Sequence, residues 1–246
     1  MANTLIVAHR GDARHAPENT LSAFESAIRA GAGAIEFDVQ EAADGEVFVF
    51  HDLYLGRTIK GQSRFGSLTT DQIKRLDAGR EFSDEFLGER VPSLHEVLSL
   101  FRGRVRFEIE LKTPSWSLSE KVIRALREFN LLDSVEVTSG HAPLLCKVHE
   151  WHRDIEIGTW FNPPPDWIKA SDYLDQIDAY ADLIGLRVVH LHETLLSSES
   201  VEKIRKSGRL IHGANLDTEM SIRNAIDLGI NRFSTNSLSL AASAVS

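Results

Sequence analysis

The stretch AIEFDVQEAADGEVFVFHD, residues 34–52, decides the fold. It opens as a strand over residues 34–39, in which Glu36 and Asp38 stand two residues apart and therefore point to the same face. Two carboxylates on one face repel each other unless a positive group lies between them. A hard divalent cation such as Mg²⁺ or Ca²⁺, which prefers oxygen ligands, is the companion that this spacing predicts.

The same stretch then turns back on itself. Asp44-Gly45 is a dipeptide that favours a tight hairpin, and the chain returns through an apolar run over residues 47–50. We expect this return to deliver His51 and Asp52 close to Glu36 and Asp38. One strand and its hairpin would then supply two acids for a metal and an imidazole for proton transfer. The hairpin need not belong to the main sheet.

Composition limits the class of protein. The chain has 246 residues, of which 42% are hydrophobic, enough for an ordinary buried core. A net charge of -9 argues against a general nucleic-acid binder, because no basic field would gather phosphates. The single cysteine, Cys146, excludes an intramolecular disulfide and is expected to be a small core residue. The chain could form a homo-oligomer. We expect no stable insertion into a membrane.

The N-terminal residues show no recognisable targeting signal. Residues 1–4 run straight into a strand, without a basic segment or a long apolar run. No signal peptide or membrane span is predicted, so the cytoplasm is the expected compartment.

Short β-like runs alternate with amphipathic helical runs along the rest of the chain. Without the hairpin, eight strands are predicted, at residues 5–8, 35–39, 106–111, 135–138, 155–160, 183–186, 209–212 and 232–234. Helix starts are predicted at Asn19, at a Ser93/Glu96 capping box and at a Ser117/Glu120 capping box. The irregular segment of about residues 53–92 is interpreted as an insertion over the site.

Eight βα units in one run predict an α/β fold, a TIM (β/α)8 barrel with a small insertion after the second strand. We expect one domain over residues 1–246, and an open doubly wound sheet stays as the alternative. In such barrels the active site lies at the carboxyl ends of the strands. The polar groups at those ends are His9, Arg10, Glu36, Asp38, Glu110 and Lys112.

These residue types suit metal-assisted chemistry on a phosphate. Glu36, Asp38 and Glu110 offer oxygen ligands, while Arg10 and Lys112 offer positive charge to a phosphate. His9 and His51 could share the acid and base duties, since an imidazole exchanges protons near neutral pH. Glu108 is expected to pair with Arg10 or another cation rather than ligate the metal. Six other histidines are interpreted as hydrogen-bonded structural residues: His15, His95, His149, His152, His190 and His192.

Seven co-linear motifs resemble the glycerophosphodiester phosphodiesterase family. They are His9-Arg10-Gly11, Ala16-Pro17-Glu18-Asn19-Thr20, Glu36-Phe37-Asp38-Val39-Gln40, Asp44-Gly45, His51-Asp52, Arg57-Thr58 and Glu110-Leu111-Lys112. The resemblance implies a metal-dependent TIM-barrel enzyme of lipid and glycerol metabolism that splits glycerophosphodiesters into an alcohol and sn-glycerol 3-phosphate. It implies His9 and His51 as general acid and base, Arg10 and Lys112 on the phosphate, and Glu36, Asp38 and Glu110 around Mg²⁺ or Ca²⁺. It also implies that the segment after His51 is the family's insertion.

The second half departs from the family pattern. Ser139-Gly140 stands where Ser-Phe is usual, Gly213-Ala214-Asn215 where Thr-Val-Asn is usual, and Thr235-Asn236 where Thr-Asp is usual. Trp160, Phe161, His141 and His212 could rebuild the pocket for the alcohol. Two alternatives stay open: a lysophospholipase D-like phosphodiesterase, and a non-catalytic phosphate-binding relative.

Overall fold

A closed barrel of parallel strands forms the centre of the molecule. The computed structural model describes residues 4–245, so residues 1–3, on which the prediction about a leader rests, lie outside the description. Strands follow one another around the barrel, and β1 pairs with both β2 and β9. This double pairing closes the sheet and excludes the open doubly wound alternative. The barrel strands are β1 (Leu5–His9), β2 (Ala34–Glu41), β4 (Arg106–Leu111), β5 (Val135–Thr138), β6 (Glu156–Phe161), β7 (Val188–His192), β8 (Leu210–Ala214) and β9 (Arg232–Thr235).

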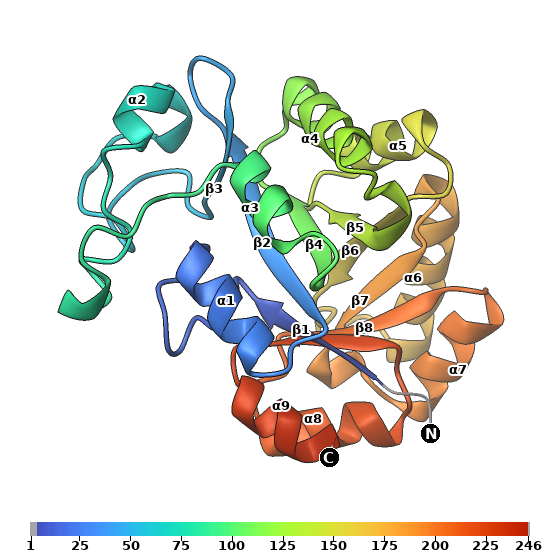
Figure 1. Ribbon diagram of the computed structural model, residues 1–246. Helices are drawn as coiled ribbons and strands as arrows, with labels where there is room; N and C mark the ends of the chain where they lie inside the picture. The colour runs from blue at the N-terminus through green and yellow to red at the C-terminus, as the bar shows by residue number, and fades with distance from the viewer. Residues whose placement is uncertain (1–3, 246) are drawn as a thin grey trace.

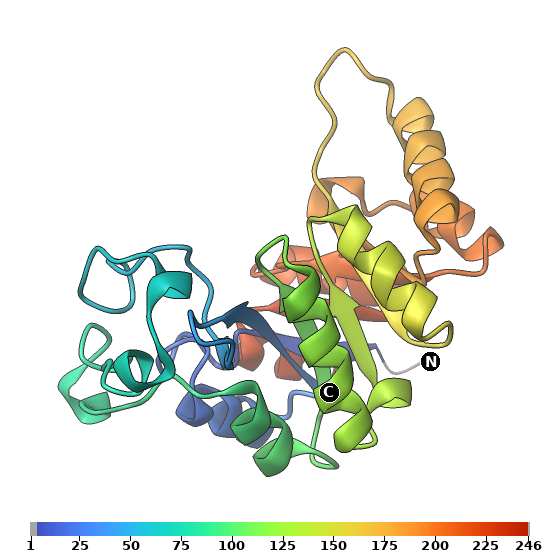
Figure 2. The same cartoon turned by 90° about the horizontal axis from the view of Figure 1, so that it is seen from above.

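Helices cover the outside of the barrel (Figures 1 and 2). They are α1 (Leu21–Arg29), α3 (Leu94–Phe101), α4 (Trp116–Glu128), α5 (Ala142–Trp151), α6 (Ala170–Ile184), α7 (Ser198–Lys206), α8 (Glu219–Asp227) and α9 (Leu238–Val245). Strand alternation sorts the side chains. On β4, Phe107 and Ile109 join the hydrophobic core beneath the helices, whereas Glu108 and Glu110 face a pocket inside the barrel. The apolar residues therefore hold the layers together and leave the interior face polar.

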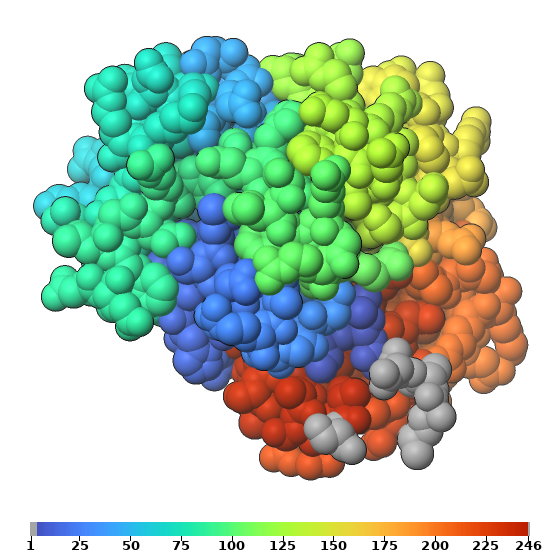
Figure 3. Space-filling view, in the orientation of Figure 1, coloured from blue at the N-terminus to red at the C-terminus, as the bar shows by residue number. Residues whose placement is uncertain are grey.

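The hairpin strand β3 (Val47–Val49) pairs antiparallel with β2 as the ninth strand of the sheet, outside the closed ring, which agrees with the count of eight barrel strands made without the hairpin. The segment between β3 and α3 contains only short helices: η1 (Phe65–Ser67), α2 (Thr70–Ile73) and η2 (Asp84–Phe86). It has a small hydrophobic core of its own, in which Phe65 stacks on Phe50 with ring centroids 4.4 Å apart. Figure 3 shows this teal segment as a lobe beside the blue N-terminal part of the barrel.

One predicted strand is wrong. Residues 183 and 184 form the last turn of α6 rather than a strand, and β7 begins at Val188. The buried residues of α6 continue at helical spacing through Ile184, and Gly185 then ends the helix with a φ of 73°. The apolar pair Leu183-Ile184 imitates a short strand, but it continues the period of the helix before it.

Two predicted helix starts and one core residue are also corrected. Thr20, not Asn19, caps α1, because the Asn19 side chain is turned to Asp38. Ser115, not Ser117, caps α4, whereas the predicted capping box of Ser93 is confirmed. Cys146 is exposed on α5 rather than buried. Among residues 4–245, no helix has the length and apolar character needed to cross a membrane.

Candidate active site

The carboxyl ends of the strands surround a cavity of about 370 Å³. His9, Arg10, Glu36 and Glu110 line this cavity, together with Trp160 and Phe161 of β6. Of the four residues expected to rebuild the alcohol pocket, Trp160 and Phe161 therefore face it. His212 is fully buried and His141 is absent from the lining.

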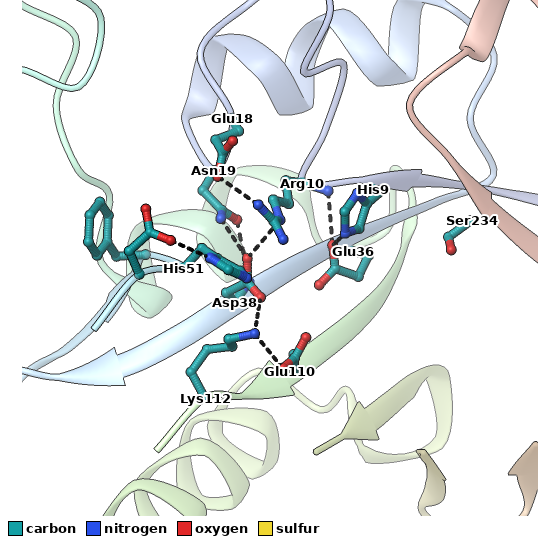
Figure 4. A network of polar contacts seen from close by, with 12 residues as sticks. His9, Arg10, Glu18, Asn19, Glu36, Asp38, His51, Glu110, Lys112 and Ser234 are labelled. Atoms are coloured by element: carbon teal, nitrogen blue, oxygen red, sulfur yellow. Dashed lines mark hydrogen bonds and ion pairs between the residues drawn. The ribbon is translucent and has the colours of Figure 1, made fainter. Parts of the chain in front are cut away.

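The polar side chains predicted from the sequence form one network at this opening (Figure 4). The Arg10 amide donates to Glu36 Oε2 at 2.9 Å, and the Arg10 guanidinium lies 3.3 Å from Asp38 Oδ2. Lys112 Nζ lies 3.5 Å from Asp38 Oδ1 and 2.6 Å from Glu110 Oε1. Three strand ends thus converge at one place.

Three carboxylates of this network have the spacing of a cation site. Glu36, Asp38 and Glu110 each present an oxygen, and these oxygens lie within 4.8 Å of one another. Burial raises the pKa of Glu36 well above its usual range, and the charges of Asp38 and Glu110 add to this effect. Burial and the charge of Asp38 raise the pKa of Glu110 to about 7, against the opposing effect of Lys112. A divalent cation would relieve this repulsion.

Asp38 is the central carboxylate. Burial alone would raise its pKa, but Lys112 and Arg10 outweigh burial and lower it. Oδ2 accepts a hydrogen bond from Asn19 Nδ2 at 2.8 Å, whereas Oδ1 is buried without a hydrogen-bond partner. An anionic oxygen in this situation fits a cation ligand, because hard divalent cations take carboxylate oxygens. Asn19 was expected to cap a helix, and its contact with Asp38 was not predicted.

The His9 ring is held by a chain of hydrogen bonds. Asn236 Nδ2 donates to Asp217 Oδ2 at 2.8 Å, which directs Asn236 Oδ1 to His9 Nδ1 at 3.0 Å. We therefore assign the proton to Nδ1, which leaves the Nε2 lone pair free, 4.0 Å from Glu36 Oε2. Burial, with help from Arg10, lowers the pKa of His9, so the neutral ring is favoured. Asn236 of the altered Thr235-Asn236 motif thus positions the His9 ring. The contribution of Asp217 to this chain was not predicted from the sequence.

The His51 ring is held by Asp52, which is in turn bound by Arg57. Its Nδ1 lies 2.7 Å from Asp52 Oδ1, and Arg57 Nε donates to Asp52 Oδ2 at 2.8 Å. Gln40 Nε2, from β2, lies within 3.2 Å of the carbonyl oxygens of Phe50, His51 and Asp52. Figure 4 shows the His51 ring beside Asp38. The Gln40 contacts fix the end of the hairpin, a role that only the alternation of β2 could have indicated.

Comparisons with known proteins agree with this geometry. A model of the glycerophosphoryl diester phosphodiesterase family matches residues 9–240. The sequence is 31% identical over 240 residues to a glycerophosphodiester phosphodiesterase of Caldanaerobacter subterraneus subsp. tengcongensis, covering 95% of this chain and 94% of the relative. It is 32% identical to one of Bacillus altitudinis, with the same two coverages.

Solved structures share the fold. A crystal structure of a glycerophosphodiester phosphodiesterase from Agrobacterium tumefaciens is similar with a TM-score of 0.86 and 27% identity, over 98% of this chain and 99% of that one. An Oleispira antarctica phosphodiesterase in complex with the product sn-glycerol-3-phosphate is similar with a TM-score of 0.83 and 24% identity, over 98% and 96% of the two chains. The chain therefore belongs to the glycerophosphoryl diester phosphodiesterase family and is an enzyme that hydrolyses phosphoric diesters.

Proposed function

We propose that this enzyme hydrolyses glycerophosphodiesters to an alcohol and sn-glycerol 3-phosphate in a reaction that depends on a divalent metal. The observation that carries the proposal is the convergence of three carboxylates, two cationic side chains and His9 in one network at the strand ends. The whole-chain match to the family supports the substrate class.

Glu36, Asp38 and Glu110 would hold the metal. Asp38 Oδ1, which has no hydrogen-bond partner, and the crowded acids around it, whose pKa values are raised, fit an oxygen-preferring ion, Mg²⁺ or Ca²⁺. Such an ion, when bound, offsets negative charge on phosphoryl oxygens. The supporting observation is the set of buried acids, which no exposed acidic surface would reproduce.

Arg10 and Lys112 would bind the phosphate. The Arg10 guanidinium now pairs with Glu18 and Asp38, and Lys112 pairs with Asp38 and Glu110. Burial alone would lower the pKa of Lys112, but Asp38 and Glu110 raise it. A cation on these acids would weaken that pairing and leave both positive groups for an anion. Arg10 would act as a planar donor and Lys112 as a point charge.

His9 and His51 would move the protons. Each ring has its Nδ1 engaged, by Asn236 and Asp52 respectively, so each Nε2 is free to accept or donate. The favoured neutral form of His9 suits a general base, and His51 would then protonate the leaving alcohol. In glycerophosphodiesters the neighbouring glycerol hydroxyl is a nucleophile within reach, so a cyclic phosphate would form first and water would open it, with the two histidines exchanging roles.

The test is release of glycerol 3-phosphate from a panel of glycerophosphodiesters, first with EDTA and then with Mg²⁺ or Ca²⁺ restored. The proposal expects no release with EDTA and recovery with one of the two metals. Release that persists in EDTA would contradict the metal dependence. Turnover of lysophospholipids alone would contradict the substrate class.

A further inference from the structure

A groove adjoins the active-site cavity at the end of strand β6. Its volume is about 340 Å³, close to the 370 Å³ of the cavity itself. The two hollows share Trp160 and Phe161, the last two residues of β6, so the groove continues the cavity. Helix α6 supplies the other wall of the groove with Tyr173, Gln176, Ile177 and Tyr180.

The groove differs from the cavity in chemistry. None of the residues of the described chain that line the groove is charged, and four of them are aromatic, whereas His9, Arg10 and Glu110 line the cavity. The rings of Phe161 and Tyr180 pack edge to face, with centroids 5.9 Å apart. These rings present an apolar surface of the kind that ordinarily lines small-molecule sites.

The polar groups of the groove are largely engaged by the protein itself. The Tyr173 hydroxyl donates to the Asn162 carbonyl oxygen at 3.0 Å, and the Thr159 hydroxyl donates to the Ser139 carbonyl oxygen at 2.9 Å. The side chain of Gln176 on α6 is exposed at the rim. A ligand in the groove therefore meets ring faces and methyl groups rather than free hydrogen-bonding groups.

Trp160 stands where the two hollows meet, and Gly140 makes room for its ring. A Cβ atom at Gly140 would stand 3.1 Å from Trp160 Cζ2 and 3.3 Å from Cη2. Gly140 does not have a positive φ, so the backbone alone does not require glycine at this position. The indole is 37% exposed. Apolar surface that stays exposed beside a reactive cavity is a candidate contact for a ligand.

The two halves of a glycerophosphodiester make different demands on these hollows. The glycerol half carries free hydroxyls, and the cavity offers them the side chains of Asn162, His192, Glu193 and Asn215. The groove is left for the alcohol on the other side of the phosphate. A cationic alcohol would find no carboxylate in the lining of the groove, whereas an apolar alcohol needs none.

We propose that the groove binds the alcohol half of the substrate and that this alcohol is an uncharged, apolar chain. The proposal rests on the proposed glycerophosphodiester hydrolysis and names its substrate class more narrowly. Each methylene that leaves water should strengthen binding about two- to fourfold, with the lower value for a methylene that stays half exposed. Because the chain lies away from the phosphorus atom, it should lower KM and change kcat little.

The first test is a series of synthetic glycerophosphodiesters whose alcohol is ethanol, butanol or hexanol, assayed for release of glycerol 3-phosphate with Mg²⁺ or Ca²⁺. We expect kcat/KM to rise by about 10- to 100-fold from the ethyl to the hexyl ester, mainly through KM. Glycerophosphocholine, whose alcohol is a cation, should rank below the hexyl ester. Equal kcat/KM along the series, or a choline ester ranked first, would overturn the proposal.

Two substitutions of Gln176 change the character of the groove. Gln176→Leu should raise the hexyl-to-ethyl ratio of kcat/KM about threefold, since it adds apolar surface. Gln176→Glu, which has nearly the same shape, should lower that ratio about threefold, because the chain would lie against a charge. Ala179→Glu adds the same charge at an exposed position of α6 outside the groove and should match the wild type. A ratio that is the same in all four proteins would contradict the assignment of the groove.

A binding measurement separates the groove from the reaction. Ethyl phosphate and hexyl phosphate are titrated by calorimetry in the presence of Mg²⁺, so that no diester is cleaved. We expect hexyl phosphate to have the lower Kd by about 10-fold or more, with the difference reduced in Gln176→Glu. If this preference holds but no glycerophosphodiester is hydrolysed, the groove stands and the proposed function fails. If short esters are hydrolysed and the two phosphates bind equally, the function stands and the groove proposal fails.

Discussion

His9 ends β1 and lines the cavity, whereas His51 follows the hairpin strand β3, and each ring is held through Nδ1 by a different partner. We expect His9→Ala and His51→Ala each to lower kcat by about 10²–10⁴-fold, because each removes one of the two proposed proton-transfer groups. Neither side chain belongs to the hydrophobic core, so the Tm should change little. Steady-state kinetics with His95→Ala, an exposed histidine, as the control would test this. A kcat near the wild-type value in either variant would contradict its role.

Metal binding should depend on pH through Glu110. Its pKa of about 7 means that this carboxyl holds its proton below neutrality and competes with the ion. The affinity for Mg²⁺ should therefore rise as pH increases through about 7, with protons released on binding. Titration calorimetry in two buffers of different ionisation enthalpy measures both quantities. In Glu110→Gln the affinity should be weaker and less dependent on pH. A wild-type affinity that stays constant between about pH 6 and about pH 8 would refute this prediction.

At the scale of single elements, α3 rests on a capping box. The Ser93 hydroxyl accepts from the Glu96 amide at 3.2 Å, and Glu96 Oε2 accepts from the Ser93 amide at 2.8 Å. Ser93→Ala should lower the free energy of unfolding by about 1 kcal/mol. Urea denaturation would measure the loss, with Ser63→Ala in the exposed insertion as the control. Equal effects of the two substitutions would argue against the cap.

Sequence patterns found most elements, and their errors have physical reasons. Ser93 and Glu96 were recognised because both halves of a capping box are visible in sequence. Ser117 has the same pattern, but its hydroxyl donates to Glu41 on β2, a partner remote in sequence. The wrong strand at residues 183–186 has a related cause. Leu183 is 80% exposed, and sequence pattern alone cannot distinguish an exposed leucine from a buried strand residue.

At the scale of the whole molecule, the insertion is joined to the active site through its own core. Phe65 is fully buried and stacks on Phe50, the residue before His51. Phe65→Ala should destabilise the protein by about 3–5 kcal/mol. It should also lower kcat while leaving Mg²⁺ affinity unchanged, since Glu36, Asp38 and Glu110 lie on barrel strands. Thermal unfolding, kinetics and calorimetry on one variant would test this, with Phe82→Ala, partly exposed, as the control. An unchanged kcat in Phe65→Ala would show that the core of the insertion does not influence the active site.

The barrel and the acidic end of the site were predictable because their residues recur at strand ends in chain order. The cluster of buried side chains inside the barrel was not, because a single histidine such as His190 is ordinarily structural. Only the closed sheet brings His190, His212 and Glu108 together from strands that are far apart in sequence. Glu108 therefore lies near these two histidines rather than pairing with Arg10, as was expected. The role of Asn236 likewise depends on Asp217, which no local pattern connects to His9.

The most direct test of the central claim is the location of the ion at the active site. Crystals grown with Mn²⁺ in place of Mg²⁺ and with glycerol 3-phosphate would be measured at the manganese absorption edge. The anomalous peak should lie within ligand distance of Glu36, Asp38 and Glu110, with the phosphate against Arg10 and Lys112. A glycerol 3-phosphate bound elsewhere, or a cavity that binds it without any ion at these three carboxylates, would contradict the proposed site.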